Sequence, residues 1–220
     1  MKLTIIIPIF NEEKFLSKLL ELVLNQKLNV TKEIIAVDDC SKDRSKEILQ
    51  NYKHKIDHII YHNKNSGKGA AIQSALKVST GDIIIIQDAD LEYDPNDYQK
   101  LINPILAGKT KVVYGSRVLN KKRYSDSSFT SLFRVFANHV LTVFSNILNN
   151  QNLTDAHTCY KMFEANIFKK IKLKENDFAF CPEVTTKISK LKYQIKEVPI
   201  SYNGRSYNEG KKINSIDGLE

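Results

Sequence analysis

The sequence DIIIIQDAD, residues 82–90, gives the sharpest structural signal in the chain. Its four consecutive isoleucines place β-branched apolar side chains on both faces, which predicts a strand over Asp82–Gln87 in the buried interior of a parallel sheet. Asp88 and Asp90 follow at once, where the chain leaves the sheet. Ligands bind at this carboxyl edge in open α/β sheets, so the stretch predicts an acidic site there.

Strand-like and helix-like segments alternate on both sides of this stretch. The expected strands are Lys2–Ile9, Glu33–Val37, Asp57–His62, Asp82–Gln87 and Lys111–Gly115. The expected helices are Glu12–Gln26 with Asn11 as its N-cap, Arg44–Tyr52 capped by Ser41 or Asp43, Gly67–Ser79, and one that opens at Asp94-Pro95 and runs to about Ala107. Such alternation predicts an α/β fold with a mostly parallel central sheet and helices on both faces.

The pattern changes after the fifth expected strand. Residues 116–128 are polar and basic, and Phe129–Leu148 predicts a helix with apolar side chains around most of its circumference. A helix over Pro182–Lys190 and a strand over Gln194–Ile200 then precede a polar, basic tail. The second half therefore departs from the regular alternation of the first.

The length and composition fit one α/β domain, or one domain plus an appendage. Of the 220 residues 42% are hydrophobic, which is enough to build a core. The formal charge of +8 favours polyanionic partners such as nucleic acid, phosphorylated substrates or an anionic membrane surface, although a lysine-rich proteome gives the same excess. Three widely spaced cysteines without a CxxC pair argue against a disulfide framework or a zinc site and fit a reducing cytosol.

No signal peptide precedes the first strand, and no stretch approaches the roughly 18 apolar residues that a membrane-spanning helix needs. The ending Gly218-Leu219-Glu220 leaves open that the natural chain continues. We therefore expect a cytoplasmic location, either free or peripheral on the cytoplasmic face of the membrane.

Two more of the expected strands lead into acidic residues, the first into Glu12 and the second into Asp38 and Asp39. One acidic strand end is weak evidence, because Asp is a routine helix cap, and a capped turn is the alternative for Asp88 and Asp90 too. Several carboxylates along one edge repel each other unless a cation or a hydrogen-bonding ligand lies between them. Mg²⁺ and Mn²⁺ are often held by one or two carboxylates plus substrate phosphates, so we expect a metal–diphosphate site.

Five short motifs occur in order along the first half: IIIPIFNE (5–12), VDDCS (37–41), NSGKGAA (65–71), DAD (88–90) and GSR (115–117). Three more follow in the second half: DAHTCYKMF (155–163), FCPE (180–183) and EVPISY (197–202). The first set resembles glycosyltransferase family 2. The second is similar to the polyprenyl-phosphate sugar synthases of that family, which include dolichyl-phosphate glucose and mannose synthases.

This resemblance implies a GT-A fold and an inverting, metal-dependent transfer of a hexose from a nucleotide-sugar, with UDP-glucose favoured over a GDP-sugar. It places Pro8, Glu12 and Asp39 in the nucleoside pocket. Asp88 would lie beside the donor sugar and diphosphate, and Lys68 near the donor. The alternative for Lys68 is an exposed lysine at a helix start.

The resemblance also assigns the metal and the two halves of the domain. Asp88 and Asp90 would hold Mg²⁺ or Mn²⁺, with Asp90 as the main ligand. Residues 1–118 would form the nucleotide-sugar-binding half, and residues 119–220 the acceptor-binding half of the same domain, with helices on the acceptor side.

A lipid-phosphate acceptor is already anionic and needs no general base, but its charge must approach the donor diphosphate. Guanidinium groups bind phosphate bidentately and keep their charge. By resemblance, Arg117, Arg134 and Arg205 lie at phosphate-binding positions. Asn138 shares a helix face with Arg134. We expect Asp88 and Arg117 to act in catalysis.

Two other functions stay open at this point. A soluble family 2 enzyme acting on a saccharide or another hydroxyl acceptor would need a carboxylate base, with Glu183 or Asp155 as the candidate. A nucleotide- or nucleic-acid-binding module would suit the charge but has no use for the two strand-end aspartates, so we expect no nucleic-acid partner. His157 invites a catalytic role, although a lone histidine is more often structural.

The apolar helix over residues 129–148 has three interpretations. It can bury its apolar face against the sheet, as such helices usually do. It can lie in the headgroup layer of a membrane, with the basic residues 121–123 before it supplying attraction to anionic lipid. It can also pack against a second subunit in a homodimer.

Overall fold

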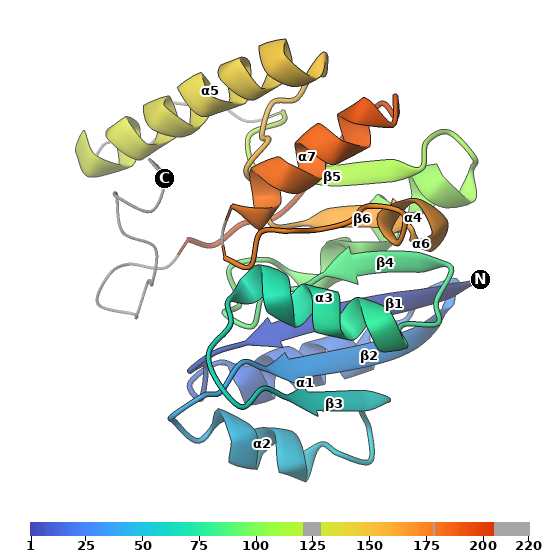
Figure 1. Cartoon of the computed structure of the whole chain (residues 1–220), viewed down its shortest axis with the longest axis vertical. Coiled ribbons are helices and arrows are strands. Elements are labelled where there is room, and N and C mark those ends of the chain that lie inside the picture. Colours follow the sequence, from blue (N-terminus) through green and yellow to red (C-terminus); the bar gives the residue numbers. More distant parts are fainter. Residues whose placement is uncertain (121–128, 178, 205–220) are drawn as a thin grey trace.

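The computed structural model describes residues 1–120, 129–177 and 179–204, and for residues 129–134 the backbone alone. Within these residues, seven strands form one sheet in the order β3-β2-β1-β4-β6-β5-β7 (Figure 1). Their bounds are β1 Lys2–Ile9, β2 Thr31–Asp38, β3 His58–Tyr61, β4 Ile83–Ile86, β5 Val112–Ser116, β6 Lys161–Glu164 and β7 Lys196–Pro199. All neighbours pair in parallel except β6, which is antiparallel to both β4 and β5. The prediction of a mostly parallel α/β sheet is confirmed.

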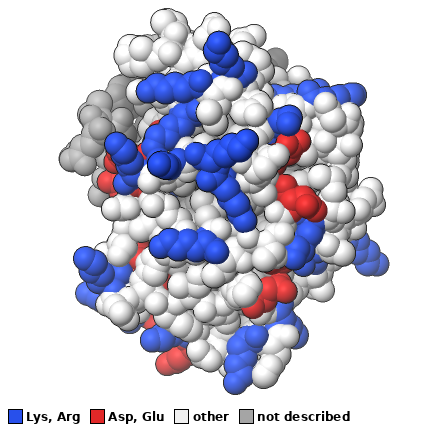
Figure 2. Space-filling view, turned by 45° about the vertical axis from the view of Figure 1, so that its right-hand side comes forward, with Lys and Arg blue, Asp and Glu red and all other residues white. Residues whose placement is uncertain are grey.

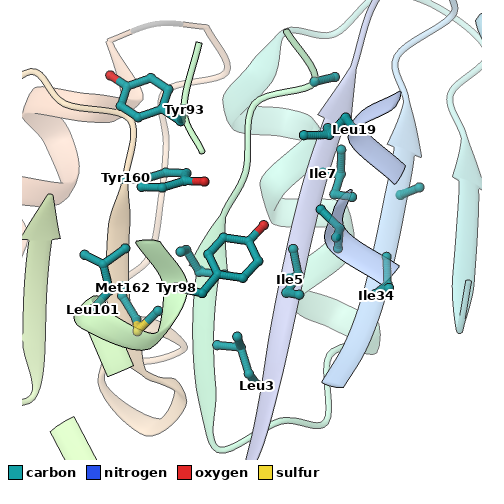
Figure 3. Packing of buried hydrophobic residues seen from close by; sticks show 14 of the residues in the cluster. Leu3, Ile5, Ile7, Leu19, Ile34, Tyr93, Tyr98, Leu101, Tyr160 and Met162 are labelled. Carbon is teal, nitrogen blue, oxygen red and sulfur yellow. The ribbon is translucent and has the colours of Figure 1, made fainter. Parts of the chain in front are cut away.

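Helices cover both faces of the sheet. They are α1 Leu16–Asn25, α2 Ser45–Asn51, α3 Lys68–Val78, the 3₁₀ turn η1 Pro95–Asp97, α4 Tyr98–Leu106, α5 Phe129–Asn149, α6 Ala165–Phe168 and α7 Phe180–Lys190. Leu3, Ile5 and Ile7 of β1 belong to the apolar cluster that contains side chains of α1 and α4 (Figure 3). Ile6 belongs to the cluster on the other face, with side chains of α3 and α7. Because successive side chains of a strand point to opposite faces, an uninterrupted apolar run is what a strand covered on both sides requires.

The first helix begins later than predicted. α1 starts at Leu16, not at Glu12, and Asn11 does not cap it. Asn11 instead has a left-handed backbone with φ of 51° and accepts a hydrogen bond from the backbone N–H of Lys42 at 2.8 Å. The strand end is thereby tied to the loop after β2, because Asn tolerates left-handed geometry better than most residues.

One strand was not expected from the sequence. β6 lies between β4 and β5 and runs against both. It begins with Lys161, which is fully buried: its ammonium donates to the carbonyl of Ala156 at 2.9 Å and lies 3.8 Å from the centroid of the Tyr114 ring. A charged residue at the start of a short segment hides the apolar pattern by which buried strands are identified.

This strand bears on the domain description. β6 and β7 come from residues beyond 118 and share the sheet with strands from the first half. The division at residue 118 stays a prediction about binding roles within one sheet.

Glu33 secures the edge of the sheet opposite to the acidic strand ends. Its carboxylate accepts from the hydroxyls of Thr4 and Thr80 and from the backbone N–H of Thr80 at 2.9 Å and of Gly81 at 3.3 Å. Lys2 lies 3.7 Å away. Burial opposes the charge of Glu33, but these hydrogen bonds outweigh it and lower the pKa from 4.5 to about 2.

We predict that Glu33→Gln lowers the free energy of unfolding at pH 7 by about 2–3 kcal/mol, because charge-assisted hydrogen bonds become neutral ones. A carboxylate whose pKa is lowered in the folded state stabilises fully above pH 4.5, and this contribution is lost as the pH falls toward 2. Urea unfolding at several pH values should therefore show a shallower loss of stability below pH 4.5 in the variant than in the wild type.

Glu164→Gln is the matched control for this measurement. Glu164 pairs with Lys111 at 3.4 Å, and the Lys111 side chain is 49% exposed. An exposed pair of this kind contributes less than about 1 kcal/mol. An equal effect of the two substitutions would contradict the role assigned to Glu33.

Candidate active site

The predicted donor residues lie along one edge of the sheet. Pro8 of β1 is in register with Val37 of β2, and the backbone N–H of Asp39 donates to the carbonyl of Ile9 at 2.8 Å. On the other side of β1, the N–H of Gln87 donates to the carbonyl of Ile6 at 2.9 Å. The carboxyl ends of β2, β1 and β4 are therefore adjacent, and β1 is the strand at which the strand order reverses. In doubly wound sheets a ligand binds at such a point.

Asp39 holds the loop that starts α3. It is only 3% exposed, and its carboxylate accepts from the N–H of Ser66 at 2.9 Å and of Gly67 at 2.7 Å. His62 Nδ1 lies 2.7 Å from the same carboxylate. Asp39 thus positions the segment that carries Lys68, and its contact with a nucleoside stays a prediction.

Asp38 and Glu12 are the other acidic groups at these strand ends. Both are buried, at 2% and 9% exposure. The backbone N–H of Glu12 donates to the hydroxyl of Ser45 at 2.9 Å, at the start of α2. Asp38 Oδ1 is a buried oxygen without a hydrogen-bond partner among the described residues. Such a group is destabilising until a donor reaches it, so a ligand N–H at this edge would be stabilised.

Lys68 and Asp88 form an ion pair across the edge. Lys68 is the first residue of α3, and its ammonium donates to Asp88 Oδ1; the two side chains are 11% and 16% exposed. Burial opposes the charge of Lys68, but the Asp88 carboxylate outweighs it and raises the pKa well above its usual value. Lys68 is therefore an ammonium facing the acidic loop, and the interpretation as an exposed lysine is wrong.

Two glycines let the segment before α7 approach this helix start. A Cβ at Gly67 would lie 2.2 Å from the carbonyl oxygen of Asn176, and a Cβ at Gly69 would lie 2.2 Å from that of Glu175. Gly67 also has φ of 90°, which a side chain would strain. The N–H of Ala70 donates to the Asn176 carbonyl at 3.2 Å. The glycines of the NSGKGAA motif therefore serve packing against the segment that leads into α7.

The Asp88–Asp90 loop suits a hard divalent cation. Both residues are partly buried, and Asp90 Oδ1 accepts from the N–H of Glu92 at 3.1 Å. In the part of the chain that the structure describes, no three His, Cys, Asp or Glu side chains come together to enclose a metal. Two carboxylates completed by phosphate oxygens are the usual Mg²⁺ arrangement, so this donor set fits an ion that binds together with a diphosphate.

Gln87, which the sequence analysis did not select, holds the start of the Asp88–Asp90 loop from the buried end of β4. It is fully buried, and its Oε1 accepts from the hydroxyls of Tyr98 at 2.6 Å and Tyr160 at 2.5 Å. Its amide donates to the carbonyl of Asp88 at 2.9 Å. The rings of Tyr93, Tyr160 and Tyr98 follow one another in the core (Figure 3), with Tyr160 in tilted contact with both of the others. A polar residue ending an apolar run was the signal that could have revealed it.

Among the residues predicted for the acceptor side, Arg117 and Asn138 meet at Asp155. Arg117 forms a bidentate pair with it, with Nε at 2.7 Å from Oδ2 and Nη2 at 2.8 Å from Oδ1, and its backbone N–H also donates to Oδ2 at 3.1 Å. Asn138 Nδ2 donates to Oδ1 at 3.3 Å. Asp155 is fully buried; burial opposes its charge, but Arg117 outweighs this and lowers its pKa to about 2.

The remaining predicted residues divide into two groups. Arg205 and the side chain of Arg134 lie outside the described residues. Glu183 accepts from the N–H groups of Lys174 at 2.8 Å and Glu175 at 3.1 Å and pairs with Lys187. Burial opposes its charge, but these bonds outweigh it and lower the pKa of Glu183. Burial and the nearby charge of Lys161 lower the pKa of His157 to about 4, so this imidazole is neutral at physiological pH.

Residues 4–172 match the family model of glycosyl transferase family 2. A dolichyl-phosphate β-glucosyltransferase of Trichomonas vaginalis is 30% identical over 91% of this chain and 65% of its own length, so the chain spans just under two thirds of that relative. A UDP-N-acetylglucosamine–dolichyl-phosphate N-acetylglucosaminyltransferase of Methanococcus voltae is 27% identical over 98% of this chain and 91% of its own.

Solved structures share the fold. Glucosyl-3-phosphoglycerate synthase from Mycobacterium tuberculosis, in complex with Mn²⁺, UDP and phosphoglyceric acid, superposes with a TM-score of 0.71 at 13% identity, covering 94% of this chain and 72% of that one. The mannosyltransferase PcManGT from Pyrobaculum calidifontis, in complex with GDP-Man and Mn²⁺, superposes with a TM-score of 0.64 at 16% identity. The match covers 90% of this chain and 54% of that one. At these identities the comparison supports the fold alone, and that fold is GT-A.

We predict that Asp155→Asn lowers the free energy of unfolding by about 3 kcal/mol, because the substitution leaves the Arg117 charge buried without its counter-ion. Thermal and urea unfolding measure the loss. The double variant Arg117→Met/Asp155→Leu is the control and should recover part of it, since it removes both charges. A loss equal in the single and double variants would show that the ion pair does not cause it.

Proposed function

The chain belongs to glycosyl transferase family 2 and is a glycosyltransferase, and on that premise we propose that it moves glucose from UDP-glucose to a dolichyl-type polyprenyl phosphate, with inversion at the sugar. The T. vaginalis relative is named for a dolichyl-phosphate acceptor and a glucosyl group, and the M. voltae relative for a UDP-sugar and the same acceptor class. Both names support a nucleotide-sugar donor and a lipid-phosphate acceptor.

The observation that carries the proposal is the buried Arg117–Asp155 pair. A hydroxyl acceptor needs a base whose pKa lies near the working pH. Asp155 has a pKa of about 2, and that of Glu183 is also lowered, so both carboxylates considered for this role are weak bases. A phosphate acceptor needs no base but needs a fixed cation, which Arg117 supplies.

Arg117 keeps donors for such an acceptor. The bonds of its side chain to Asp155 engage two of the five N–H groups of a guanidinium. Because Asp155 fixes the plane of the group, the remaining edge is oriented before the acceptor arrives, which reduces the entropy lost on binding. Asn138, on the same carboxylate, would extend this donor surface. We assign Arg134 and Arg205 the same role.

On the donor side, Asp88 and Asp90 would hold Mg²⁺ or Mn²⁺, and Pro8, Glu12 and Asp39 would line the nucleoside pocket. The metal, when bound, neutralises charge that develops on the leaving diphosphate. Lys68 is already held as an ammonium beside Asp88, so it adds a second positive group on that side.

We predict that label from UDP-glucose enters the lipid phase only when polyprenyl phosphate and Mg²⁺ or Mn²⁺ are both supplied. Asp90→Ala should lower the rate at least about 100-fold, because stabilisation of the leaving group is lost. Asp94→Ala is the matched control: Asp94 accepts from the N–H of Asn96 at 2.9 Å and caps η1, so the variant should lose some stability but keep its rate.

A saccharide acceptor is supplied in parallel. Label on the saccharide with none in the lipid phase would overturn the acceptor assignment and leave the family membership intact.

We also propose that α5 contacts the membrane that carries the acceptor. No helix among the described residues is long and apolar enough to cross a bilayer. Yet α5 exposes large apolar side chains, up to 75% at Ile147: Phe136, Val140, Leu141, Val143, Phe144, Ile147 and Leu148. These side chains are exposed and are not part of the core, so burial against the sheet does not account for them.

Basic residues flank this apolar surface. Gln151, just past α5, donates to the hydroxyl of Ser189 at 3.0 Å and to the carbonyl of Tyr193 at 2.9 Å, so the end of α5 lies beside the end of α7. The exposed Lys190 and Lys192 lie there. On the face seen in Figure 2, Lys and Arg side chains predominate over Asp and Glu. An apolar face beside ammonium groups suits an anionic lipid surface.

We predict that Ile147→Ser/Leu148→Ser weakens binding to phosphatidylglycerol-containing vesicles roughly tenfold, because exposed apolar area no longer enters the bilayer. Sedimentation with vesicles measures this. Leu106→Ser is the control, since Leu106 is 39% exposed on α4, away from this surface. Unchanged vesicle binding would contradict membrane contact through this surface. A dimer that the double variant dissociates would assign the surface to a second copy instead.

A further inference from the structure

The segment that follows β7 lies across the loop that follows β4. Tyr202 forms an antiparallel bridge with Tyr93, and the N–H of Asn203 donates to the carbonyl of Glu92 at 2.9 Å. The N–H of Ser201 donates to Asp97 Oδ2 at 2.6 Å, so the segment is held on both sides of Tyr202. Residues 201–203 therefore join the loop of the two strand-end aspartates to the sheet edge where β5 delivers Arg117.

The side chain of Tyr202 touches both halves of the site. Its hydroxyl donates to Glu92 Oε2 at 2.8 Å, and the N–H of Glu92 in turn donates to Asp90 Oδ1 at 3.1 Å. The guanidinium carbon of Arg117 lies 5.1 Å from the centre of the Tyr202 ring, and the Tyr93 ring packs edge-on at 5.3 Å.

The chemistry of each contact is defined. Burial, and then the Glu92 carboxylate, raises the pKa of Tyr202, so its hydroxyl stays protonated and acts as a donor to that carboxylate. A cation over an aromatic face is attracted by the ring quadrupole. Arg117 is thus held between the Asp155 carboxylate and the Tyr202 ring, and Glu92 is held by the hydroxyl of the same tyrosine.

We propose that Tyr202 is a positioning residue that aligns the two reactants: its hydroxyl fixes Glu92 and with it the metal-binding loop, and its ring supports Arg117 on the acceptor side. The inference rests on the proposed function, in which these two groups bind the metal–diphosphate and the acceptor phosphate. The new element is that one side chain, Tyr202, sets the distance between the metal-binding loop and Arg117. A fixed distance between these groups would hold the diphosphate and the acceptor phosphate in a reactive geometry despite their repulsion.

The two contacts can be removed separately. Tyr202→Phe keeps the ring and deletes the hydroxyl, so it should raise the dissociation constant of Mn²⁺ in the presence of UDP about tenfold, the lower end of what loss of a supporting partner of a metal site causes. It should leave the KM for polyprenyl phosphate unchanged. Tyr202→Leu removes both contacts and should in addition raise that KM about fivefold.

Mn²⁺ binding is measured from the electron paramagnetic resonance signal of the free ion at fixed UDP, which does not depend on catalysis. Tyr52→Phe is the matched control, because the Tyr52 hydroxyl donates to Glu21 at 3.2 Å between α1 and α2, remote from the site. It should change neither constant. Melting temperatures of all variants separate a loss of folded protein from a change of affinity.

A double-mutant cycle tests the route of the effect. If the hydroxyl acts through Glu92, the effect of Tyr202→Phe on Mn²⁺ binding should disappear in a Glu92→Ala background. Persistence of the effect there, or a Tyr202→Phe protein with wild-type Mn²⁺ affinity, would overturn the proposal, and so would a Tyr202→Leu protein whose acceptor KM equals that of Tyr202→Phe. Absence of sugar transfer to lipid phosphate in the wild type would refute the proposed function instead, while the Mn²⁺ measurements would still test the Glu92 contact.

Discussion

Carboxylates at the edge of a buried sheet must be matched by donors, and this constraint shapes the whole site. Asp39 is matched by two backbone N–H groups, Asp88 by the Lys68 ammonium, and Asp155 by the Arg117 guanidinium. At Asp155 burial alone would favour the protonated acid, but Arg117 outweighs it and lowers the pKa to about 2. The matching also fixes geometry, because every donor belongs to a different element from its acceptor.

The same constraint separates the two chemical tasks of the site. The donor side combines carboxylates and an ammonium on the loops after β4 and before α3, which suits a cation shared with a diphosphate. The acceptor side presents a guanidinium whose counter-charge, Asp155, is fully buried. Asp155, with a pKa of about 2, is too weak a base to remove the proton of a hydroxyl acceptor. A fixed guanidinium, in contrast, binds an anion directly. These electrostatics support the proposed phosphate acceptor without reference to the relatives' names.

Local signals made part of this structure predictable. The β1 bounds Lys2–Ile9 were predicted as observed, because an apolar β-branched run that ends at polar residues has few other solutions. The acidic edge followed from adjacent parallel strands. What failed depended on distant contacts: Lys161 is buried by a carbonyl and an aromatic ring, and Arg117 finds its partner 38 residues away. Neither contact produces a periodic pattern in the sequence. The strand β6 and the ion pair between Arg117 and Asp155 could therefore not be predicted from it.

The insertion of β6 explains why donor and acceptor groups are mechanically joined. β5, which leads into Arg117, lies between β6 and β7, both of which come later in the chain. Asp155 precedes β6, and Tyr202 follows β7, so the two groups that hold Arg117 approach it from the strands on either side.

β6 also pairs with β4, the strand that delivers Asp88 and Asp90. Any shift of Arg117 relative to the Asp88–Asp90 loop must therefore deform one continuous hydrogen-bonded ladder, which is stiffer than a contact between separate domains. Such stiffness is what the alignment of two mutually repelling anions requires.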